Sequence, residues 1–360
     1  MLKAIQHVEP DITPVNLGGI YGLERWQQRF GVASELELRR QLDLDIEYAR
    51  PVYQGARLQE GLGIWGTPVD GVFSSDGVGY GSDRGNFPLQ NCSSVAEIEQ
   101  FAWPSPDDFN YDVIATVLRK IPEHKAKRVD GKYGLLKEGK SPEQCAQGGP
   151  WVPLICTLFD LFGMQETLLN FHLRPMVMEA AIRRIEEFTL EFARRSMQAG
   201  RGLADIYFYG DDFATQRGLM ISPAQWRQFL KPTYRKVFAL AKSMGYRVWF
   251  HSCGTFRPVL GDLVDCGMDV WETVQAHLPG NEPESLKRDF GKHITFYGAI
   301  STQHTLPEGT ADQVRAEVRQ RIRVLGEGGG YICGSDHGIM PDVPIDNVLA
   351  LIDEARRFRR

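Results

Sequence analysis

The sequence predicts an α/β protein built as a single (β/α)8 TIM barrel with an irregular N-terminal elaboration. From residue 200 onward, short runs rich in β-branched and aromatic residues alternate with helical patterns. This alternation is typical of parallel strands joined by right-handed helical crossovers. Polar residues of catalytic types directly follow several of these runs, as they do at the carboxyl-terminal mouth of such barrels. A length of 360 residues also accommodates one large barrel with insertions.

Five short apolar runs are the clearest predicted strands. Polar and glycine-containing loops bound them, and their spacing leaves room for a helix after each. They are ADIYFYG (204–210), RVWFHSC (247–253), DVWETVQ (269–275), ITFYGAI (294–300) and GYICGS (330–335). PWVPLIC (150–156) has the same character and is expected to form an earlier strand.

Capping patterns and apolar periodicity predict helices between these strands. Segments 94–97, 222–225 and 310–313 each carry Ser or Thr followed three residues later by Glu or Gln, which is a capping box. The segment 176–199 predicts a long outer helix, because apolar residues recur on one face at helical spacing. That face comprises Ala181, Ile185, Phe188 and Phe192.

The first 130 residues differ from the rest of the chain. Gly- and Pro-rich stretches alternate there with short helical pieces, and no low-complexity linker or charge run separates them from the later residues. We therefore expect residues 1–130 to form an elaboration packed on the barrel, and residues 131–360 to form its main body within one structural domain.

Composition excludes several classes of function. The net charge of −5 and the pI near 6.0 provide no positive field for nucleic acid or an anionic membrane. No segment approaches the ~20 apolar residues that span a bilayer, and the first residues lack the apolar core of a secretory signal. A cytoplasmic location, reduced cysteines, and a small-molecule or protein partner are therefore expected.

His251 and Cys253 are the strongest candidate metal ligands. They end a predicted strand, and residues two apart in a strand point to the same side, so both can bind one ion. Cys333 and His337 follow a later strand. If one of these two completes the set, a fourth position stays open, as in a catalytic zinc site, whereas four protein ligands would make a structural site. Zinc suits such mixed sulfur and nitrogen ligands.

Asp211 and Asp212 are candidate catalytic carboxylates, because they directly follow the predicted strand at 204–210. Either could act as a general acid or base, or could orient a metal-bound histidine. Adjacent residues in an extended strand point in opposite directions, so we expect one of the two to face the site.

Three long segments give the sequence a resemblance to the uroporphyrinogen decarboxylase superfamily. They are DIYFYGDDFATQRGLMISPAQWRQFLKP, VWFHSCGTFRPVLGDLVDCGMDVWETVQ and GGGYICGSDHGIMPDVPIDNVLALIDEA. The resemblance runs from about residue 50 to the C-terminus and includes GIWGTPVDGVF and FAWPSPDD. It implies a single (β/α)8 barrel with the site at the carboxyl-terminal mouth.

Within that superfamily, His251-Ser252-Cys253-Gly254 is similar to the His-x-Cys-Gly zinc motif of the corrinoid-dependent methyltransferases. The resemblance implies bound zinc, a separate corrinoid protein as partner, and transfer of a methyl group between that corrinoid and a small methylated substrate or thiol. Two positions depart from the branch. His337 stands where those enzymes place a third ligand cysteine, with Cys333 as the possible substitute, and Gln275 stands where they place a displaceable glutamate.

Two alternatives remain open in the sequence. A His-Gly-Ile segment like that at His337 is a trait of the cofactor-free decarboxylases, in which Asp211 and His337 would handle protons. Arg25 and Arg29 have the spacing of an arginine pair that grips carboxylates in those enzymes, although an i, i+4 pair on a surface helix also explains them. The other alternative is a non-catalytic homologue that contains zinc.

Overall fold

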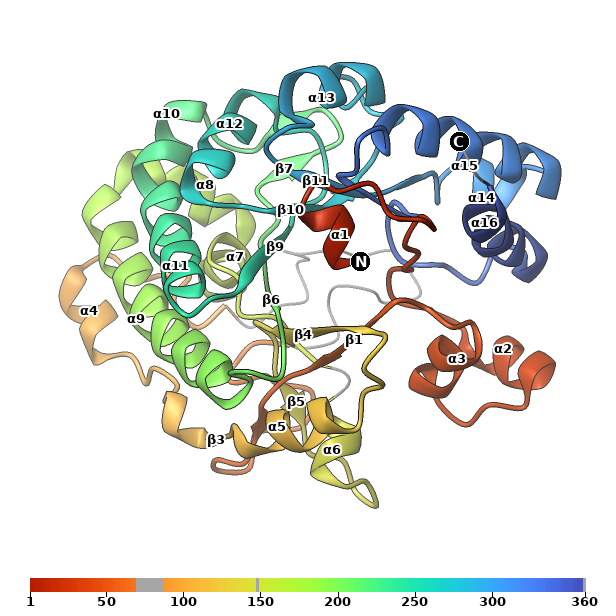
Figure 1. Cartoon of the computed structure of the whole chain (residues 1–360). Helices are drawn as coiled ribbons and strands as arrows, with labels where there is room; N and C mark the ends of the chain where they lie inside the picture. The colour runs from red at the N-terminus through yellow and green to blue at the C-terminus, as the bar shows by residue number, and fades with distance from the viewer. Residues whose placement is uncertain (69–86, 147–148, 359–360) are drawn as a thin grey trace.

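A parallel sheet in sequence order forms the centre of the protein, with helices outside it (Figure 1). The computed structural model describes residues 1–68, 87–146 and 149–358. Within these ranges the sheet has seven strands: β1 (Ile46–Ala49), β4 (Ala126–Asp130), β6 (Ile206–Gly210), β9 (Arg247–His251), β10 (Val270–Val274), β11 (Thr295–Ile300) and β12 (Tyr331–Ser335). The prediction of an α/β fold with parallel strands is confirmed, and a closed eight-stranded barrel stays a prediction.

The two edge strands of this sheet both lie next to the Val15 segment, residues 14–16. The amide of Asn16 donates to the carbonyl of Cys333, and the amide of Cys333 donates to the carbonyl of Pro14, at 3.0 and 2.9 Å. On the other side, the amide of Asp45, which precedes β1, donates to the carbonyl of Val15 at 3.0 Å. The first residues of the chain therefore bridge its first and last main strands.

All five clear strand predictions are confirmed, but the prediction of a strand at 150–156 is wrong. Trp151 makes one isolated antiparallel bridge with Lys132, and the chain then enters α7 (Ile155–Phe162). Pro150 and Pro153 lack the backbone N–H that a strand ladder needs. The next three amides, of residues 154–156, donate to the carboxylate of Asp211, which fixes the start of the helix.

The outer layer consists of helices that follow or flank the main strands. They are α5 (Asp112–Arg119), α9 (Pro175–Ala199), α11 (Lys231–Ser243), α12 (Arg257–Cys266), α13 (Pro283–Phe290), α15 (Ala311–Leu325) and α16 (Ile345–Arg357). The long helix predicted at 176–199 is α9, and its predicted apolar face is buried. The capping boxes at Ser94, Ser222 and Thr310 all form. None of the described helices combines the length and apolar character needed to cross a membrane.

Shorter elements occupy the loops between these strands and helices. The helices are α1 (Leu2–Ile5), α2 (Leu23–Phe30), α3 (Glu35–Gln41), α4 (Val95–Gln100), α6 (Pro142–Cys145), α8 (Met164–Leu173), α10 (Pro223–Gln225), α14 (Thr305–Glu308), a 3-10 turn (Pro106–Asp108) and a π-helical turn (Trp226–Leu230). The short strands are β2 (Val52–Tyr53), β3 (Phe109–Asn110), β5 (Gly134–Leu135), β7 (Ala214–Thr215) and β8 (Gly218–Leu219).

The N-terminal region contributes directly to the main sheet. Both β1 and β4 lie before residue 131, so two of the seven strands come from the part expected to be an elaboration. The division at residue 130 stays a prediction. Of the segment GIWGTPVDGVF, residues 69–73 lie outside the described residues.

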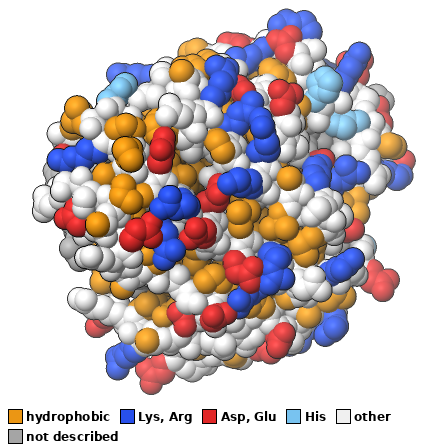
Figure 2. Space-filling model, turned by 90° about the vertical axis from the view of Figure 1, so that its left-hand side faces the viewer, with side chains coloured by type: hydrophobic (Ala, Val, Ile, Leu, Met, Phe, Trp, Pro, Cys, Tyr) orange, Lys and Arg blue, Asp and Glu red, His pale blue; other side chains and the backbone are white. Residues whose placement is uncertain are grey.

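One end of the sheet is covered by α1, which leaves the other end for chemistry. Ala4 and Ile5 pack with Ile46, Ala126 and Ile206, which are the first residues of their strands, in an apolar cluster. Over the outer helices, acidic and basic side chains are interspersed (Figure 2). This mixture agrees with the weak net charge.

Because α1 covers the amino ends of the strands, the candidate site is expected at their carboxyl ends.

Candidate functional site

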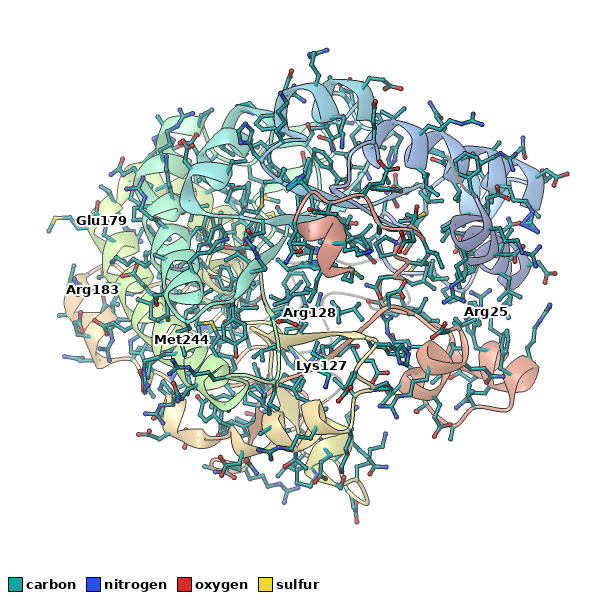
Figure 3. All side chains as sticks on the ribbon, in the orientation of Figure 1. Arg25, Lys127, Arg128, Glu179, Arg183 and Met244 are labelled. Carbon is teal, nitrogen blue, oxygen red and sulfur yellow. The ribbon has the colours of Figure 1, made fainter. Side chains whose placement is uncertain are left out.

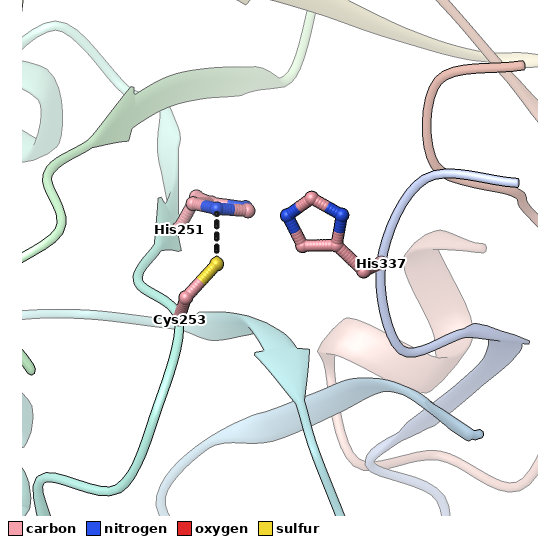
Figure 4. Close-up of side chains that lie close together, drawn as sticks. All are labelled: His251, Cys253 and His337. Carbon is pink, nitrogen blue, oxygen red and sulfur yellow. Dashed lines mark hydrogen bonds between the residues drawn. The ribbon is translucent and has the colours of Figure 1, made fainter. Parts of the chain in front are cut away.

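Three potential ligand atoms converge at the carboxyl ends of the strands, as Figure 4 shows. His251 is the last residue of β9, Cys253 lies two residues beyond it, and His337 lies two residues beyond β12. One ligand atom from each side chain lies within 4.8 Å of the other two. Cys253 Sγ and His251 Nε2 are 3.4 Å apart. The structure therefore brings together three of the four predicted ligands.

Glu272 and Trp151 fix the imidazole of His251. Glu272 is the register neighbour of His251 on β10, and its Oε1 lies 3.1 Å from His251 Nδ1. The ring of Trp151 packs edge-on against the imidazole, with centroids 4.7 Å apart. With Nδ1 engaged by a carboxylate, Nε2 is the nitrogen that faces Cys253 and is available to a metal.

The carboxylate of Glu272 stays charged despite its burial. Burial raises its pKa, but the hydrogen bond with His251 and the nearby charges of His251, Arg128 and Lys132 outweigh burial and hold the pKa at about 2. Glu272 Oε2 lies 3.5 Å from Arg128 Nη1, and the indole N–H of Trp249 donates to the same oxygen. A fixed negative charge therefore stands behind His251 at neutral pH.

The adjacent carboxylates Asp212 and Asp211 have different surroundings. Asp212 Oδ1 accepts a hydrogen bond of 2.8 Å from the amide of Cys253 and lies 3.8 Å from His251 Nε2. Asp211 instead accepts from three amides at the start of α7, at 2.8 to 3.2 Å, and from the Tyr234 hydroxyl at 2.8 Å. Burial raises the pKa of Asp211 to about 6. Asp212 thus borders the three ligands, whereas Asp211 anchors α7.

Cys333 lies on the helix-facing side of β12, separate from the three ligands. Residues alternate between the two faces of a strand, and Ile332 packs in the apolar cluster inside the sheet, whereas Cys333 belongs to the core between the sheet and the helices. Its side chain is fully buried, and burial raises the pKa of its thiol to about 12. Between the two candidates for the third ligand, the geometry groups His337 with His251 and Cys253.

The donor set of His251, Cys253 and His337 fits zinc. Zinc bonds of ~2.3 Å to sulfur and ~2.0–2.1 Å to nitrogen place the two atoms ~3.5 Å apart around a tetrahedral ion, close to the 3.4 Å between Cys253 and His251. Burial and the neighbouring His251 lower the pKa of His337, which favours the neutral form that binds metals. Burial and Asp212 raise the pKa of the Cys253 thiol, so a cation is needed to stabilise its thiolate.

Gln275 occupies a supporting position. Its side-chain oxygen accepts a hydrogen bond of 2.7 Å from the amide of Gly254, and its carbonyl accepts from Asn281. Gly254 has φ +84°, and a Cβ there would meet the backbone of Thr215 at 2.5 Å, so the turn after Cys253 requires glycine. Gln275 therefore holds the backbone that follows Cys253.

Sequence reasoning missed a cluster of charged side chains inside the sheet, in which Arg128 lies beside Glu272, the partner of His251. Arg50 and Arg128 share the buried carboxylate of Asp130, at 2.8 and 2.6 Å, and Figure 3 shows Arg128 near the centre of the fold at β4. Lys132 follows β4 by two residues. The available signal was alternation: Arg128, Asp130 and Lys132 are spaced two apart and so share one face of an extended chain.

Arg25 and Arg29 lie on a surface helix, α2, and both contact the C-terminal region. Arg25 donates to the carbonyls of Met340, Pro341 and Val343 at 2.5 to 2.9 Å. Arg29 pairs with Asp346 at 2.6 Å. These contacts attach α2 to the segment after His337.

Comparisons with known proteins agree with this arrangement. The family described as uroporphyrinogen decarboxylase (URO-D) matches residues 138–358. A methylcobamide:CoM methyltransferase, MtaA, from Methanosarcina barkeri is 25% identical over 248 residues, covering 69% of this chain and 68% of the relative. A uroporphyrinogen decarboxylase from Thermus thermophilus is 25% identical over 177 residues, 47% of this chain and 46% of the relative.

A solved structure has a similar fold over nearly the whole chain. It is a methyltransferase from Methanosarcina mazei, with a TM-score of 0.62 and 18% sequence identity, covering 98% of this chain and 96% of the other. The family match alone spans more than half of the sequence. The chain is therefore an enzyme that belongs to the uroporphyrinogen decarboxylase (URO-D) family.

Proposed function

We propose that this enzyme is a zinc-dependent methyltransferase that acts with a separate corrinoid protein. It would move a methyl group between the corrinoid and a small methylated substrate or thiol. The observation that carries the proposal is the convergence of one sulfur and two imidazole nitrogens within 4.8 Å at the carboxyl ends of β9 and β12. The similarity to methylcobamide:CoM methyltransferases supports it.

His251, Cys253 and His337 would hold the ion, leaving its fourth position for substrate. Zinc in this position supplies Lewis acidity, which lowers the pKa of a bound thiol or polarises a methylated heteroatom. Glu272 fixes the orientation of His251 through Nδ1. Asp212 positions Cys253 through its amide and places a carboxylate oxygen 3.8 Å from His251 Nε2, where it can accept the proton of an incoming thiol.

Contacts in the N-terminal region favour this function over decarboxylation of a polycarboxylate. The arginine pair that would grip such a substrate is engaged elsewhere, because Arg25 and Arg29 bind the C-terminal region. The decarboxylase alternative predicts activity that survives chelators and carbon dioxide release that stops in His337→Ala. The non-catalytic alternative predicts a metal enclosed by four protein ligands.

Three further expectations accompany the proposal. Hydrogen bonds from the Val15 segment to both edges of the sheet support a closed (β/α)8 barrel. We also propose that residues 1–130 form an elaboration on a barrel body made by residues 131–360. The third expectation is that the protein is located in the cytosol.

Metal analysis of the purified protein tests the proposal. We expect one zinc ion per chain, and a methyl transfer from methylcobalamin to a thiol that can be followed by the corrinoid absorbance. Removal of zinc by a chelator should abolish the transfer, and added zinc should restore it. Protein that contains no zinc and transfers methyl groups equally well after chelation would contradict it.

A further inference from the structure

A cavity opens beside the three candidate ligands, on the rim formed by the loops at the carboxyl ends of the strands. Its volume is about 980 Å³, and its walls come mainly from α8, the β7–β8 hairpin, α10 and the start of α12. The helices α8, α10 and α12 lie together in the upper left of Figure 1. Thr255, which follows Cys253 by two residues, lines the cavity, but none of the three ligands does. The cavity is therefore a neighbour of the candidate site and is separate from it.

Hydrogen bonds connect the wall of this cavity to the turn that carries Cys253. The amide of Thr255 donates to the carbonyl of Thr215 on the hairpin at 3.0 Å, and the side chain of Asn281 donates to the carbonyl of Gly254 at 3.1 Å. A molecule seated in the cavity would thus lie against the loop that follows Cys253. Methyl transfer requires the two reacting groups to come into contact, so a partner protein has to cover the mouth and touch its rim.

Exposed apolar side chains continue the cavity outward along α8. Leu168 and His172, one helical turn apart, line the cavity. Leu169 and Leu173 form the next stripe of the same helix and are 44% and 71% exposed, and Met176 at the start of α9 is 71% exposed. Clustered exposed apolar side chains mark surfaces that bind other proteins. A small molecule inside the cavity would leave this stripe uncovered, so the arrangement favours a protein as the occupant.

The charge of the cavity indicates what that protein presents. Among the residues that the structure describes, no aspartate or glutamate lines the cavity, whereas Arg217 and Arg257 do. Arg257 is already paired with Asp289. Arg217 stands at the exposed tip of the β7–β8 hairpin, and its guanidinium forms no ion pair with another described residue. Its complement is a carboxylate on the partner.

We propose that the cavity and the exposed leucines of α8 form the docking surface for the separate corrinoid protein, which inserts an apolar side chain into the cavity and places a carboxylate at Arg217. This inference rests on the proposed function and deepens it by naming the surface that the partner uses. The partner leaves after each transfer, and a small interface with few charged contacts suits such a short-lived complex.

Binding measurements with a corrinoid protein test this surface. Each corrinoid protein encoded in the same genome would be produced, loaded with methylcobalamin and titrated against the wild-type enzyme, and the tightest binder would serve as the probe. Biolayer interferometry would measure its Kd with zinc-loaded and with metal-free enzyme. We expect Arg217→Glu and Leu173→Glu to weaken binding by ~10-fold or more, as replacement of central interface residues does. Both variants should transfer methyl groups from free methylcobalamin at the wild-type rate.

Matched variants away from the cavity provide the controls. Leu136→Glu makes the same change as Leu173→Glu at a leucine that is 55% exposed next to β5. Arg201→Glu reverses an exposed charge before β6, at the amino ends of the strands. Both should bind the probe like the wild type, and thermal midpoints would show that all four variants are folded. Added salt should weaken binding to the wild type more than binding to Arg217→Gln, because salt screens the exposed ion pair.

Several results would overturn the docking surface. Unchanged binding in folded Arg217→Glu and Leu173→Glu would do so, as would the failure of every corrinoid protein to bind the wild type. Self-association of the enzyme that Leu173→Glu abolishes would assign the surface to a second copy of this chain. Slower transfer from free methylcobalamin in Arg217→Glu would make the cavity part of the substrate site.

The same measurements separate this inference from the proposed function. Zinc-dependent transfer from free methylcobalamin, with no effect of the variants on binding of the probe, would leave the proposed function intact and overturn the docking surface. Binding that Arg217→Glu and Leu173→Glu weaken, in an enzyme that neither holds zinc nor transfers methyl groups, would support the surface and contradict the proposed function.

Discussion

Two aspartates and two cysteines at the carboxyl ends of this sheet divide between its faces. Asp212 and Cys253 border the mouth, where the amide of Cys253 donates to Asp212 and the thiol lies beside His251. Asp211 and Cys333 face the helices and are fully buried. The two pairs have the same side-chain types, but one pair borders the candidate site and the other pair belongs to the packed interior.

The contrast shows how a strand end separates reactive groups from structural ones. At the mouth, Asp212 and Cys253 retain partial exposure, and their neighbours are other titratable side chains. On the helix side, backbone amides and a tyrosine hydroxyl use the carboxylate of Asp211. Because adjacent side chains point in opposite directions, a difference of one position in the sequence determines whether a carboxylate is available to a substrate or holds a helix in place.

The largest expected difference lies between the two cysteines. Cys253→Ala should lose bound zinc and reduce methyl transfer by ~100-fold or more, because it removes one of the three proposed zinc ligands. Cys333→Ala should keep both and lose roughly 1 kcal/mol of stability through a small cavity. Metal analysis, activity and chemical denaturation measure the three quantities. Zinc lost from Cys333→Ala but retained in His337→Ala would reverse the assignment of the third ligand.

The aspartates should differ in stability. Asp211→Ala leaves the three amides of α7 and the Tyr234 hydroxyl without their acceptor, so unfolding should become easier by about 3 kcal/mol. Asp212→Asn keeps the shape and an acceptor, so it should unfold near the wild-type midpoint while methyl transfer falls. Urea denaturation of both variants, with activity measured in native buffer, makes the comparison. Equal stability of the two variants would contradict it.

Glu272 tests whether a side chain that contacts His251 affects the affinity for zinc. Glu272→Gln removes the charge behind His251 but preserves its size, so zinc affinity should fall ~10–100-fold, as for other carboxylate partners of ligand histidines. Competition with a chromophoric chelator measures this affinity. The matched control is Glu284→Gln, which makes the same change at an exposed glutamate on α13. An unchanged zinc affinity in Glu272→Gln would show that this contact does not tune the metal.

Lys132 provides the last test, an effect on stability that depends on pH. Its pKa falls from 10.5 to about 7 on folding because of burial and Arg50. Between these values the unfolded chain binds more protons than the folded one, so this group's contribution to stability rises with pH from about 7 to 10.5. Asp130 and Glu272 oppose this effect, and Arg128 reinforces it.

Replacement of Lys132 should therefore stabilise the protein most at or below neutral pH. The thermal midpoint of Lys132→Met should exceed that of the wild type near pH 7, and the gap should close toward pH 10. Lys140→Met serves as the exposed control at each pH. A gap that does not change with pH would mean that Lys132 keeps an ordinary pKa in the folded protein.

Much of the fold could be predicted because its signals are local. The runs that became β6, β9, β10, β11 and β12 combine β-branched and aromatic residues with turns at both ends, and periodicity places α9 almost to the residue. The segment 150–156 failed because its apolar character does not reveal that Asp211, distant in sequence, binds its amides. The strand β1 was missed because Ile46–Ala49 is short and contains a charged residue.

The site was predictable to the extent that it follows strand alternation. The two-residue spacing of His251 and Cys253 indicates a shared side from sequence alone. The choice between Cys333 and His337, and between Asp211 and Asp212, depends on which face of the strand each side chain occupies at the strand's end. Glu272 and Trp151 contact His251 from other parts of the chain, and Lys132 lies over the ring of Trp151. Only the three-dimensional pairing of these elements places them there.

The Val15 segment has a consequence for how this chain folds. Each main strand pairs with the next one in sequence, so the sheet can grow in the order of synthesis. The segment near Val15 is different, since its partners on β12 are made last: the amide of Gly18 donates to the Ser335 hydroxyl, 317 residues away. Contacts of such high sequence separation form slowly. The contacts of residues 14–18 with β12 can therefore form only after the last main strand has been made.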